Sequence, residues 1–285
     1  MVYADYIRQI EIDALWSGKK HILWTLDPHV NILSGINGVG KSTILNKLFR
    51  SVNTNGDVVN HLLKGVSIVP EPADATHVRF DMIRSLDSPM LDIRGDRSDH
   101  GDAKDYLRSQ SGPFAASTFS ALDLQLYNLQ HKYLDYQVNI GNRIIAELQR
   151  GNTDAAQQLS QPKTRFQDMI DELFEETGKR IVRTENEIRF SQIGETLAPY
   201  QLSSGEKQML IILLTVLVED QLPYVLLMDE PEVSLHIEWQ KRLIDLILEL
   251  NPQVQIILTT HSPAVIMNGW IDKVTEVSDI TVHSA

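Results

Sequence analysis

Alternating apolar and polar positions open the chain. Residues 6–12 alternate over most of their length, as a strand buried on one face does. A second strand-like run covers residues 21–26, and a third, more continuously apolar run covers residues 30–34. The pattern predicts a hairpin that leads into the third strand.

A helix is predicted after a glycine-rich stretch, because four apolar residues between positions 44 and 49 have helical spacing. Two more strand-like runs come next, at residues 66–69 and 77–83. From residue 86 to residue 113 the composition turns polar, and we interpret this stretch as a surface loop.

The middle of the chain is predicted to be helical. Residues 121–150 carry apolar side chains at mostly helical spacing, residues 151–161 suggest a polar break, and residues 165–177 resume the pattern. These two arms are too short for a long coiled coil. Residues 179–183 and 187–190 then indicate a small hairpin.

The last third alternates helices with buried strands. Residues 209–217 predict a buried helix, and residues 224–228 form an unbroken apolar run that is typical of a parallel strand buried on both faces. An amphipathic helix from Trp239 to Leu250 and a second parallel-type strand over residues 253–260 follow. These patterns predict an α/β fold with a mostly parallel central sheet, an N-terminal antiparallel β part and an inserted helical lobe.

The length of 285 residues suits one large α/β domain. We expect a single domain over residues 1–285, with a core formed by residues 1–85 and 201–285 and a helical insertion over residues 86–200.

Composition narrows the function classes. The chain has no cysteine, which excludes disulfides, thiolate metal sites and a cysteine nucleophile. The formal net charge of −12 argues against a surface that binds nucleic acid broadly, although a local basic groove would be compatible with it. The longest apolar run, residues 209–218, is too short to cross a bilayer, and the N-terminus lacks the layout of a signal peptide, so we expect a cytoplasmic protein.

The glycine-rich stretch between the third strand and the first helix matches G-x-x-x-x-G-K-[ST], the phosphate-binding P-loop pattern. Its residues are Gly35, Ile36, Asn37, Gly38, Val39, Gly40, Lys41, Ser42 and Thr43. The glycines let backbone N–H groups point at phosphate oxygens. We expect Lys41 to neutralise the β and γ phosphates and the Ser42 hydroxyl to hold Mg²⁺.

Two acidic residues come directly after the apolar residues 224–228. Asp229 and Glu230 stand at the carboxyl end of this predicted strand, where α/β sheets place their ligands. Asp229 is a candidate for the Mg²⁺ shell, and Glu230 is a candidate to polarise a water molecule aimed at the γ-phosphate.

Two further sequences are candidates by their positions. The serine-rich turn at Ser203 precedes the buried helix and would cap it, which also makes an anion site. After the last core strand, Ser262 and Pro263 predict a helix start that holds His261 at the ligand edge, as a sensor of the γ-phosphate.

Together these sequences resemble the ATP-binding-cassette (ABC) ATPase superfamily, most closely its soluble branch, which includes heads similar to those of SMC and of the overcoming-lysogenization-defect proteins. The similar pieces, in the order of that superfamily, are Gly35–Thr43 as Walker A, residues 202–206 as signature, residues 227–231 as Walker B, residues 232–236 as D-loop and residues 260–263 as switch.

The resemblance implies an ATP- and Mg²⁺-dependent ATPase whose two copies pair head to tail around the nucleotide. It assigns Glu230 and His261 to catalysis, and Ser42 and Asp229 to the metal. The signature residues that would act on the second copy's ATP are Ser203, Ser204, Gly205 and Glu206, and the D-loop residues are Ser234, Leu235 and His236.

The sequence departs from the family pattern at several positions. Ser204 stands where transporters usually carry glycine, and residues 81–88, the expected place of the Q-loop glutamine, contain none. Choosing Gln110 or Gln125 instead would be arbitrary. Trp16 has two interpretations, a packed hairpin aromatic, which we prefer, or a stacking partner for adenine.

The leading functional hypothesis is an ATPase whose ATP-driven dimerisation regulates a separate effector protein in a defence or repair setting. Little chain follows the switch sequence, so we expect the effector to be another polypeptide. One alternative is the nucleotide-binding motor subunit of a membrane ABC transporter, and another is a DNA-binding, SMC-like repair head.

Overall fold

The computed structural model describes residues 1–15, 20–51, 65–84 and 120–282 of the chain. The chain divides into two compact units, residues 1–85 with 221–285 and residues 86–220. Residues 86–113, where a surface loop is expected, lie outside the described residues. Trp16 does too, so its two interpretations stay open.

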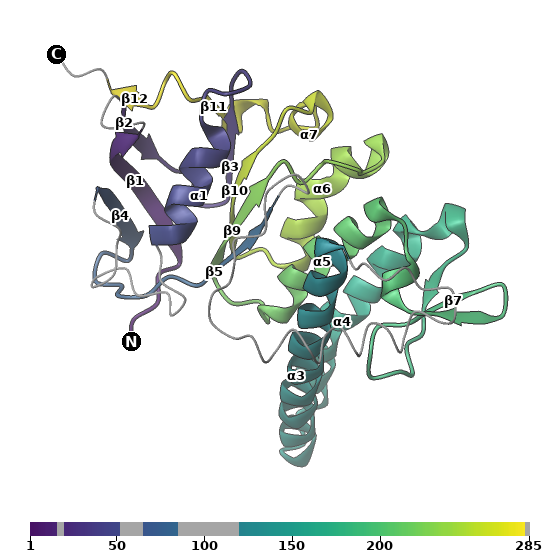
Figure 1. Ribbon diagram of the computed structural model, residues 1–285. Coiled ribbons are helices and arrows are strands. Elements are labelled where there is room, and N and C mark those ends of the chain that lie inside the picture. The colour runs from purple at the N-terminus through teal and green to yellow at the C-terminus, as the bar shows by residue number, and fades with distance from the viewer. Residues whose placement is uncertain (16–19, 52–64, 85–119, 283–285) are drawn as a thin grey trace, which may run out of the picture. The chain divides into compact units, whose positions relative to one another are not determined.

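An antiparallel sheet occupies one side of the first unit (Figure 1). Its strands, in the order β12-β2-β1-β4, are Thr281–Val282, Lys20–Thr25, Tyr6–Leu15 and Val66–Glu71. All three strand pairings are antiparallel. The N-terminal hairpin predicted from the alternating pattern is confirmed.

A second sheet of the same unit is wholly parallel. Its strands, in the order β11-β3-β10-β9-β5, are Val274–Glu276, Val30–Ser34, Val254–Thr259, Tyr224–Asp229 and Phe80–Ile83. Every residue of β9 and β10 is buried, which explains why both sequences are mostly apolar. The register pairs Thr259 with Asp229, so the carboxyl ends of these two strands lie side by side.

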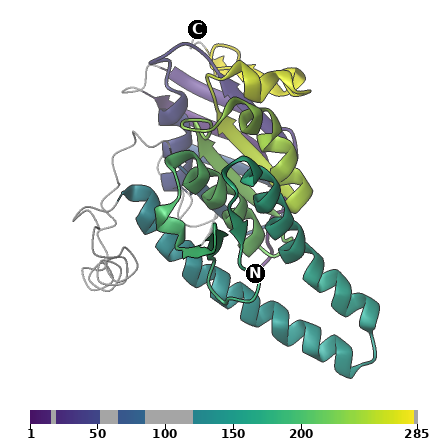
Figure 2. The same cartoon turned by 90° about the vertical axis from the view of Figure 1, so that its right-hand side faces the viewer.

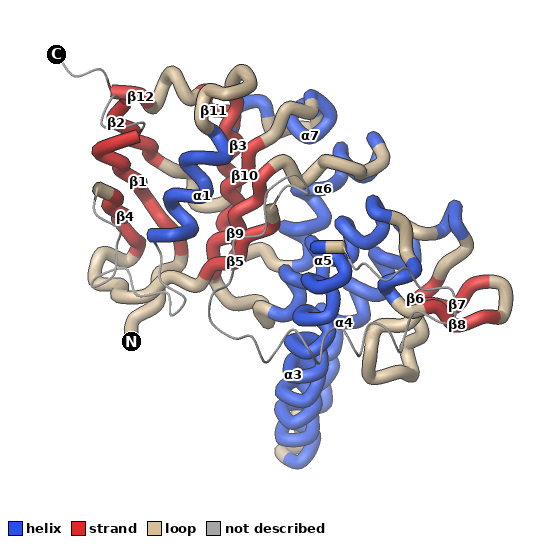
Figure 3. Tube along the Cα trace, viewed as in Figure 1, coloured by secondary structure: helices blue, strands red, loops and turns tan. Residues whose placement is uncertain are grey.

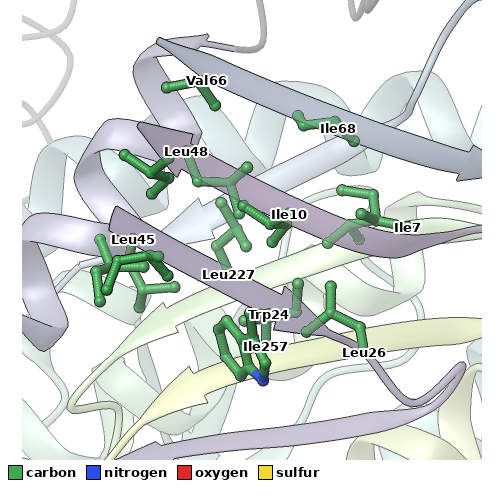
Figure 4. Packing of buried hydrophobic residues seen from close by; sticks show 14 of the residues in the cluster. Ile7, Ile10, Trp24, Leu26, Leu45, Leu48, Val66, Ile68, Leu227 and Ile257 are labelled. Atoms are coloured by element: carbon green, nitrogen blue, oxygen red, sulfur yellow. The ribbon is translucent and has the colours of Figure 1, made fainter. Parts of the chain in front are cut away.

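Helix α1 (Lys41–Ser51) connects the two sheets through the core. Its buried residues Ile44, Leu45 and Leu48 join a cluster with residues of β1, β2, β4, β9 and β10. Figure 4 shows Leu45 and Leu48 of this helix among side chains such as Ile10, Trp24 and Leu227. Each fully buried leucine or isoleucine stabilises the fold by roughly 1.5–3 kcal/mol, so this cluster holds α1 against both sheets.

Helices α6 (Ile237–Leu250) and α7 (Pro263–Met267) also belong to the first unit. Figure 3 shows α6 on the face of the parallel sheet that is turned away from α1. The residues that α6 buries, including Leu243, Ile247 and Leu250, recur at helical spacing, as the amphipathic pattern predicts.

The second unit is mainly helical and contains α3 (Ala121–Gln149), α4 (Thr153–Leu173) and α5 (Ser204–Val218). Figure 2 shows α3 and α4 running side by side in opposite directions. A small antiparallel sheet of β6 (Arg180–Ile181), β7 (Phe190–Gln192) and β8 (Glu195–Leu197) completes the unit and confirms the predicted hairpin.

The polar break predicted over residues 151–161 is wrong. The chain turns at Gly151, which has φ 80°, and α4 begins two residues later at Thr153. The first turns of α4 are polar because most of their side chains are exposed, and Gln and Ala suit a helix as well as a loop. The turn therefore takes two residues, Gly151 and Asn152.

Helix α5 packs against α3 and α4 and groups with the second unit. The compact helical unit therefore ends at residue 220. The insertion expected over residues 86–200 stops before this helix. No helix in the described ranges combines the length and apolarity that a bilayer crossing demands.

Candidate functional site

The glycine loop of the first unit connects β3 to α1. Gly38 and Gly40 have φ values of 79° and 105°, which residues with a Cβ rarely adopt. A Cβ added to Gly35, whose φ is 147°, would lie 2.9 Å from a methyl carbon of Val39. The loop therefore depends on glycine at these positions.

Lys41 begins α1 and turns its ammonium group back over the loop. Its Nζ donates hydrogen bonds to the carbonyl oxygens of Gly35 at 2.8 Å and Ile36 at 3.4 Å. Burial lowers the pKa of Lys41, while the nearby negative charges of Glu230 and Asp229 act in the opposite direction. The loop thus holds a cation among its own carbonyl groups.

Asp229, the last residue of β9, lies beside the start of α1. Its Oδ1 accepts hydrogen bonds from Ser42 Oγ at 2.9 Å and from Thr259 Oγ1 at 2.6 Å. The structure therefore brings together Ser42 and Asp229, which the sequence proposes as metal ligands. Their hydroxyl and carboxylate oxygens are donors that suit Mg²⁺.

Glu230 has a left-handed backbone conformation, with φ 48°. Its N–H donates to the carbonyl oxygen and to Oγ1 of Thr259, both at 3.1 Å, which holds this conformation. Its Oε1 lies 3.4 Å from Nε2 of His261. Left-handed non-glycine residues cluster at functional sites, because the surrounding structure must hold them in place.

A pocket of about 420 Å³ opens at this edge of the parallel sheet. Its lining residues are Asn37, Gly38, Gly40, Lys41, Ser42, Thr43, Glu230 and His261. Most of the P-loop candidates and both catalytic candidates therefore meet at one cavity, whose volume is in the range of small-molecule sites.

The signature candidates belong to the second unit. Ser203 caps α5 by accepting a hydrogen bond from the Glu206 N–H at 3.3 Å, and Ser203 and Ser204 are exposed. The Glu206 carboxylate, in contrast, is buried and accepts hydrogen bonds from Lys179 at 2.8 Å and Thr177 at 2.9 Å. The helix start presents hydroxyl and backbone groups, while Glu206 is engaged within its own unit.

The D-loop candidates lie in the first unit, next to the pocket in sequence but not in its lining. Ser234 has φ 72°, Leu235 is buried, and His236 caps α6 by accepting a hydrogen bond from the Glu238 N–H at 3.4 Å.

Sequence reasoning missed the role of Thr259. Its hydroxyl group hydrogen-bonds Asp229 and Glu230 and so fixes both acidic candidates. The available signal was a threonine at the end of a strand that pairs in parallel with the strand of Asp229.

The Q-loop glutamine is still unassigned. Gln110 and residues 85–88 lie outside the described residues, and Gln125 belongs to α3 of the second unit. The histidine spacing in the sequence suggests no metal site, but strand pairing gathers His21 with Glu11 and Asp13 on the antiparallel sheet. This group is partly exposed, and exposed carboxylates often gather without an ion.

Solved structures similar to this chain include three heads of SMC proteins. The Smc head bound to the C-terminal winged-helix domain of ScpA is 16% identical over 92% of this chain and 91% of that chain, with a TM-score of 0.49. A second, with an extended coiled coil and the C-terminal domain of ScpA, from Pyrococcus furiosus, is 15% identical over 92% and 91%, with a TM-score of 0.48. The SMC head domain from Thermotoga maritima is 16% identical over 92% of both chains, with a TM-score of 0.44.

Among curated proteins, none matches this chain. Residues 92–268, more than half of the sequence, match the family described as "AAA domain, putative AbiEii toxin, Type IV TA system". The match includes the Walker B, D-loop and switch residues, and the glycine loop precedes it. The chain therefore belongs to this family of AAA-type P-loop ATPase domains.

Proposed function

We propose that this protein binds ATP with Mg²⁺ and hydrolyses it. The observation that carries the proposal is the pocket in which Lys41 and Ser42 of the glycine loop face Glu230 and His261 from the ends of two strands. A phosphate-binding loop needs a cation and backbone N–H groups, and hydrolysis needs a group that orients water. This one cavity supplies both.

Four residues of the pocket and the neighbouring Asp229 have roles in this proposal. Lys41 exchanges the carbonyl groups of its own loop for the β and γ phosphates when ATP binds. Ser42 and Asp229 would hold Mg²⁺, which would neutralise phosphate charge. Glu230 orients and polarises the attacking water, and His261, 3.4 Å from Glu230, contacts the γ-phosphate.

We further propose that ATP joins two copies head to tail. Ser203, Ser204 and Gly205 at the start of α5 would bind the γ-phosphate held by the partner, since the start of a helix favours anions. In this proposal residues 1–285 form one ATPase domain, and its ATP-dependent dimerisation regulates a separate effector. The family description, which names a putative toxin of a toxin–antitoxin system, supports a defence-related role.

Replacing the candidate water-orienting residue tests hydrolysis. Glu230→Gln should retain ATP binding, because Lys41 and the glycine loop are unchanged, and should lower kcat on the order of 100-fold or more. Phosphate release and binding of a fluorescent ATP analogue measure the two effects. Glu238→Gln, an exposed carboxylate of α6 that pairs with Lys241, is the matched control and should turn over normally. Unchanged turnover by Glu230→Gln would refute the assignment.

A further inference from the structure

A buried carboxylate holds the loop that carries His261. Glu232, which is 7% exposed, follows β9 by three residues. Its Oε1 accepts hydrogen bonds from Thr260 Oγ1 at 2.6 Å, from the His261 N–H at 3.0 Å and from the Ser262 N–H at 3.3 Å. One oxygen therefore anchors three consecutive residues that follow β10.

Gln240 of α6 links the same two loops a second time. Its Nε2 donates to the carbonyl oxygen of Leu235 at 2.9 Å, and its Oε1 accepts from Ser262 Oγ at 2.6 Å. The four residues Glu232, Gln240, Thr260 and Ser262 are here called the clasp. The hydrogen bonds of the clasp hold residues 260–262 in place. The imidazole side chain of His261 is 39% exposed and lies beside the pocket.

The second carboxylate oxygen of Glu232 indicates that the clasp has a role besides stabilising the fold. Within the described residues, Glu232 Oε2 is buried and has no hydrogen-bond partner. A buried carboxylate with one oxygen unsatisfied is costly, and each such group in a folded protein calls for an explanation. Precise placement of the neighbouring histidine is one.

We propose that Glu232 and Gln240 are positioning residues that fix His261 relative to Glu230 and couple it to the segment at residues 233–235. The inference rests on the proposed ATPase function and adds to it a means of regulation at the same site. A shift of either loop is transmitted through the clasp to the imidazole group. Because misplacing a catalytic group by about 1 Å can cost 100-fold in rate, loss of the clasp should reduce turnover without removing the nucleotide site.

Glu232→Ala tests the positioning role. The variant should lower kcat on the order of 100-fold and leave the affinity for ATP near that of the wild type, because no clasp residue lines the pocket. Hydrogen exchange at the His261 amide should become faster, since it loses its acceptor, whereas the Ser262 amide keeps Thr260 Oγ1 as an acceptor at 2.9 Å. Glu232→Gln keeps an oxygen for the same donors and should show smaller effects in both measurements.

A double-mutant cycle separates positioning from general destabilisation. If Glu232 acts through His261, adding Glu232→Ala to His261→Ala should lower kcat no further. Gln255→Ala is the matched control, because buried Gln255 hydrogen-bonds the backbone of Ile7 and Asp27 elsewhere on β10. It should reduce the melting temperature and leave kcat near the wild-type value.

Two results would contradict the positioning role proposed for the clasp. One is unchanged turnover and unchanged amide exchange in Glu232→Ala, and the other is a loss of kcat that adds fully to that of His261→Ala. Both outcomes can be measured only if the wild-type protein hydrolyses ATP. Absence of turnover in the wild type would instead contradict the proposed function itself, and the amide exchange would still report on the clasp.

Discussion

At the scale of single residues, the glycine loop can be predicted from the sequence because its backbone conformation requires particular residues. Gly38 and Gly40 are needed for their positive φ values, and Lys41 and Ser42 follow at fixed spacing. The partners of Glu232 were not predictable in the same way. They lie 28 to 30 residues away and meet it because β9 and β10 pair in parallel.

Lys41 allows a direct test of nucleotide binding. Lys41→Ala should abolish binding, because it removes the one loop cation that would meet the β and γ phosphates. Isothermal titration with ATP and Mg²⁺ measures the effect. Arg50→Ala, which removes an exposed cation from the last turn of the same helix, is the control and should bind as the wild type does. Binding of ATP by Lys41→Ala with unchanged affinity would remove the loop from the account.

At the scale of elements, strongly periodic segments predicted the correct helices and strands. The hairpin of β1 and β2, the buried strands β9 and β10 and the amphipathic helix α6 all follow from their patterns. The polar first turns of α4 were missed, because an exposed helical segment and a loop have similar compositions. The grouping of α5 with α3 and α4 depends on tertiary packing, which no local pattern encodes.

The start of α5 depends on Glu206. Burial raises the pKa of this carboxyl group, but hydrogen bonds from Lys179, Ser203 and Thr177 outweigh burial and lower the pKa below its ordinary value of 4.5. A lowered pKa in the folded state adds stability above pH 4.5, and this stability is lost as the pH falls through the folded-state value.

Glu206→Gln should therefore reduce the free energy of unfolding at neutral pH by roughly 3 kcal/mol, because it leaves Lys179, whose side chain is only 13% exposed, without its partner. The difference from the wild type should shrink in acid. Urea unfolding followed by circular dichroism at neutral and acidic pH measures it. Glu238→Gln is the control, since that exposed carboxylate should change stability little. A difference that stays constant from neutral pH into acid would contradict the electrostatic explanation.

At the scale of the whole molecule, the sequence carries the family and the fold class but not the assembly. The family match shows an AAA-type P-loop ATPase domain, which is consistent with the resemblance to the ABC-type ATPase superfamily, and the α/β fold with its parallel sheet is confirmed by the strand order. The proposed dimerisation and the proposed effector involve other chains, so no local pattern within this one determines them.

The central claim is that ATP binds between two copies and holds them together. To move the protein from mostly open to mostly closed, ATP must favour the closed state by roughly 5.5 kcal/mol. Two shared nucleotides can supply this through charge-assisted hydrogen bonds to phosphate.

Sedimentation velocity of Glu230→Gln with and without ATP and Mg²⁺ tests this claim most directly, because the variant should bind ATP and not consume it. The account predicts a monomer without nucleotide and a dimer with ATP, and replacing the exposed Ser203 with a bulky arginine should abolish the dimer without abolishing ATP binding. A Glu230→Gln protein that binds ATP and sediments as a monomer under both conditions would contradict it.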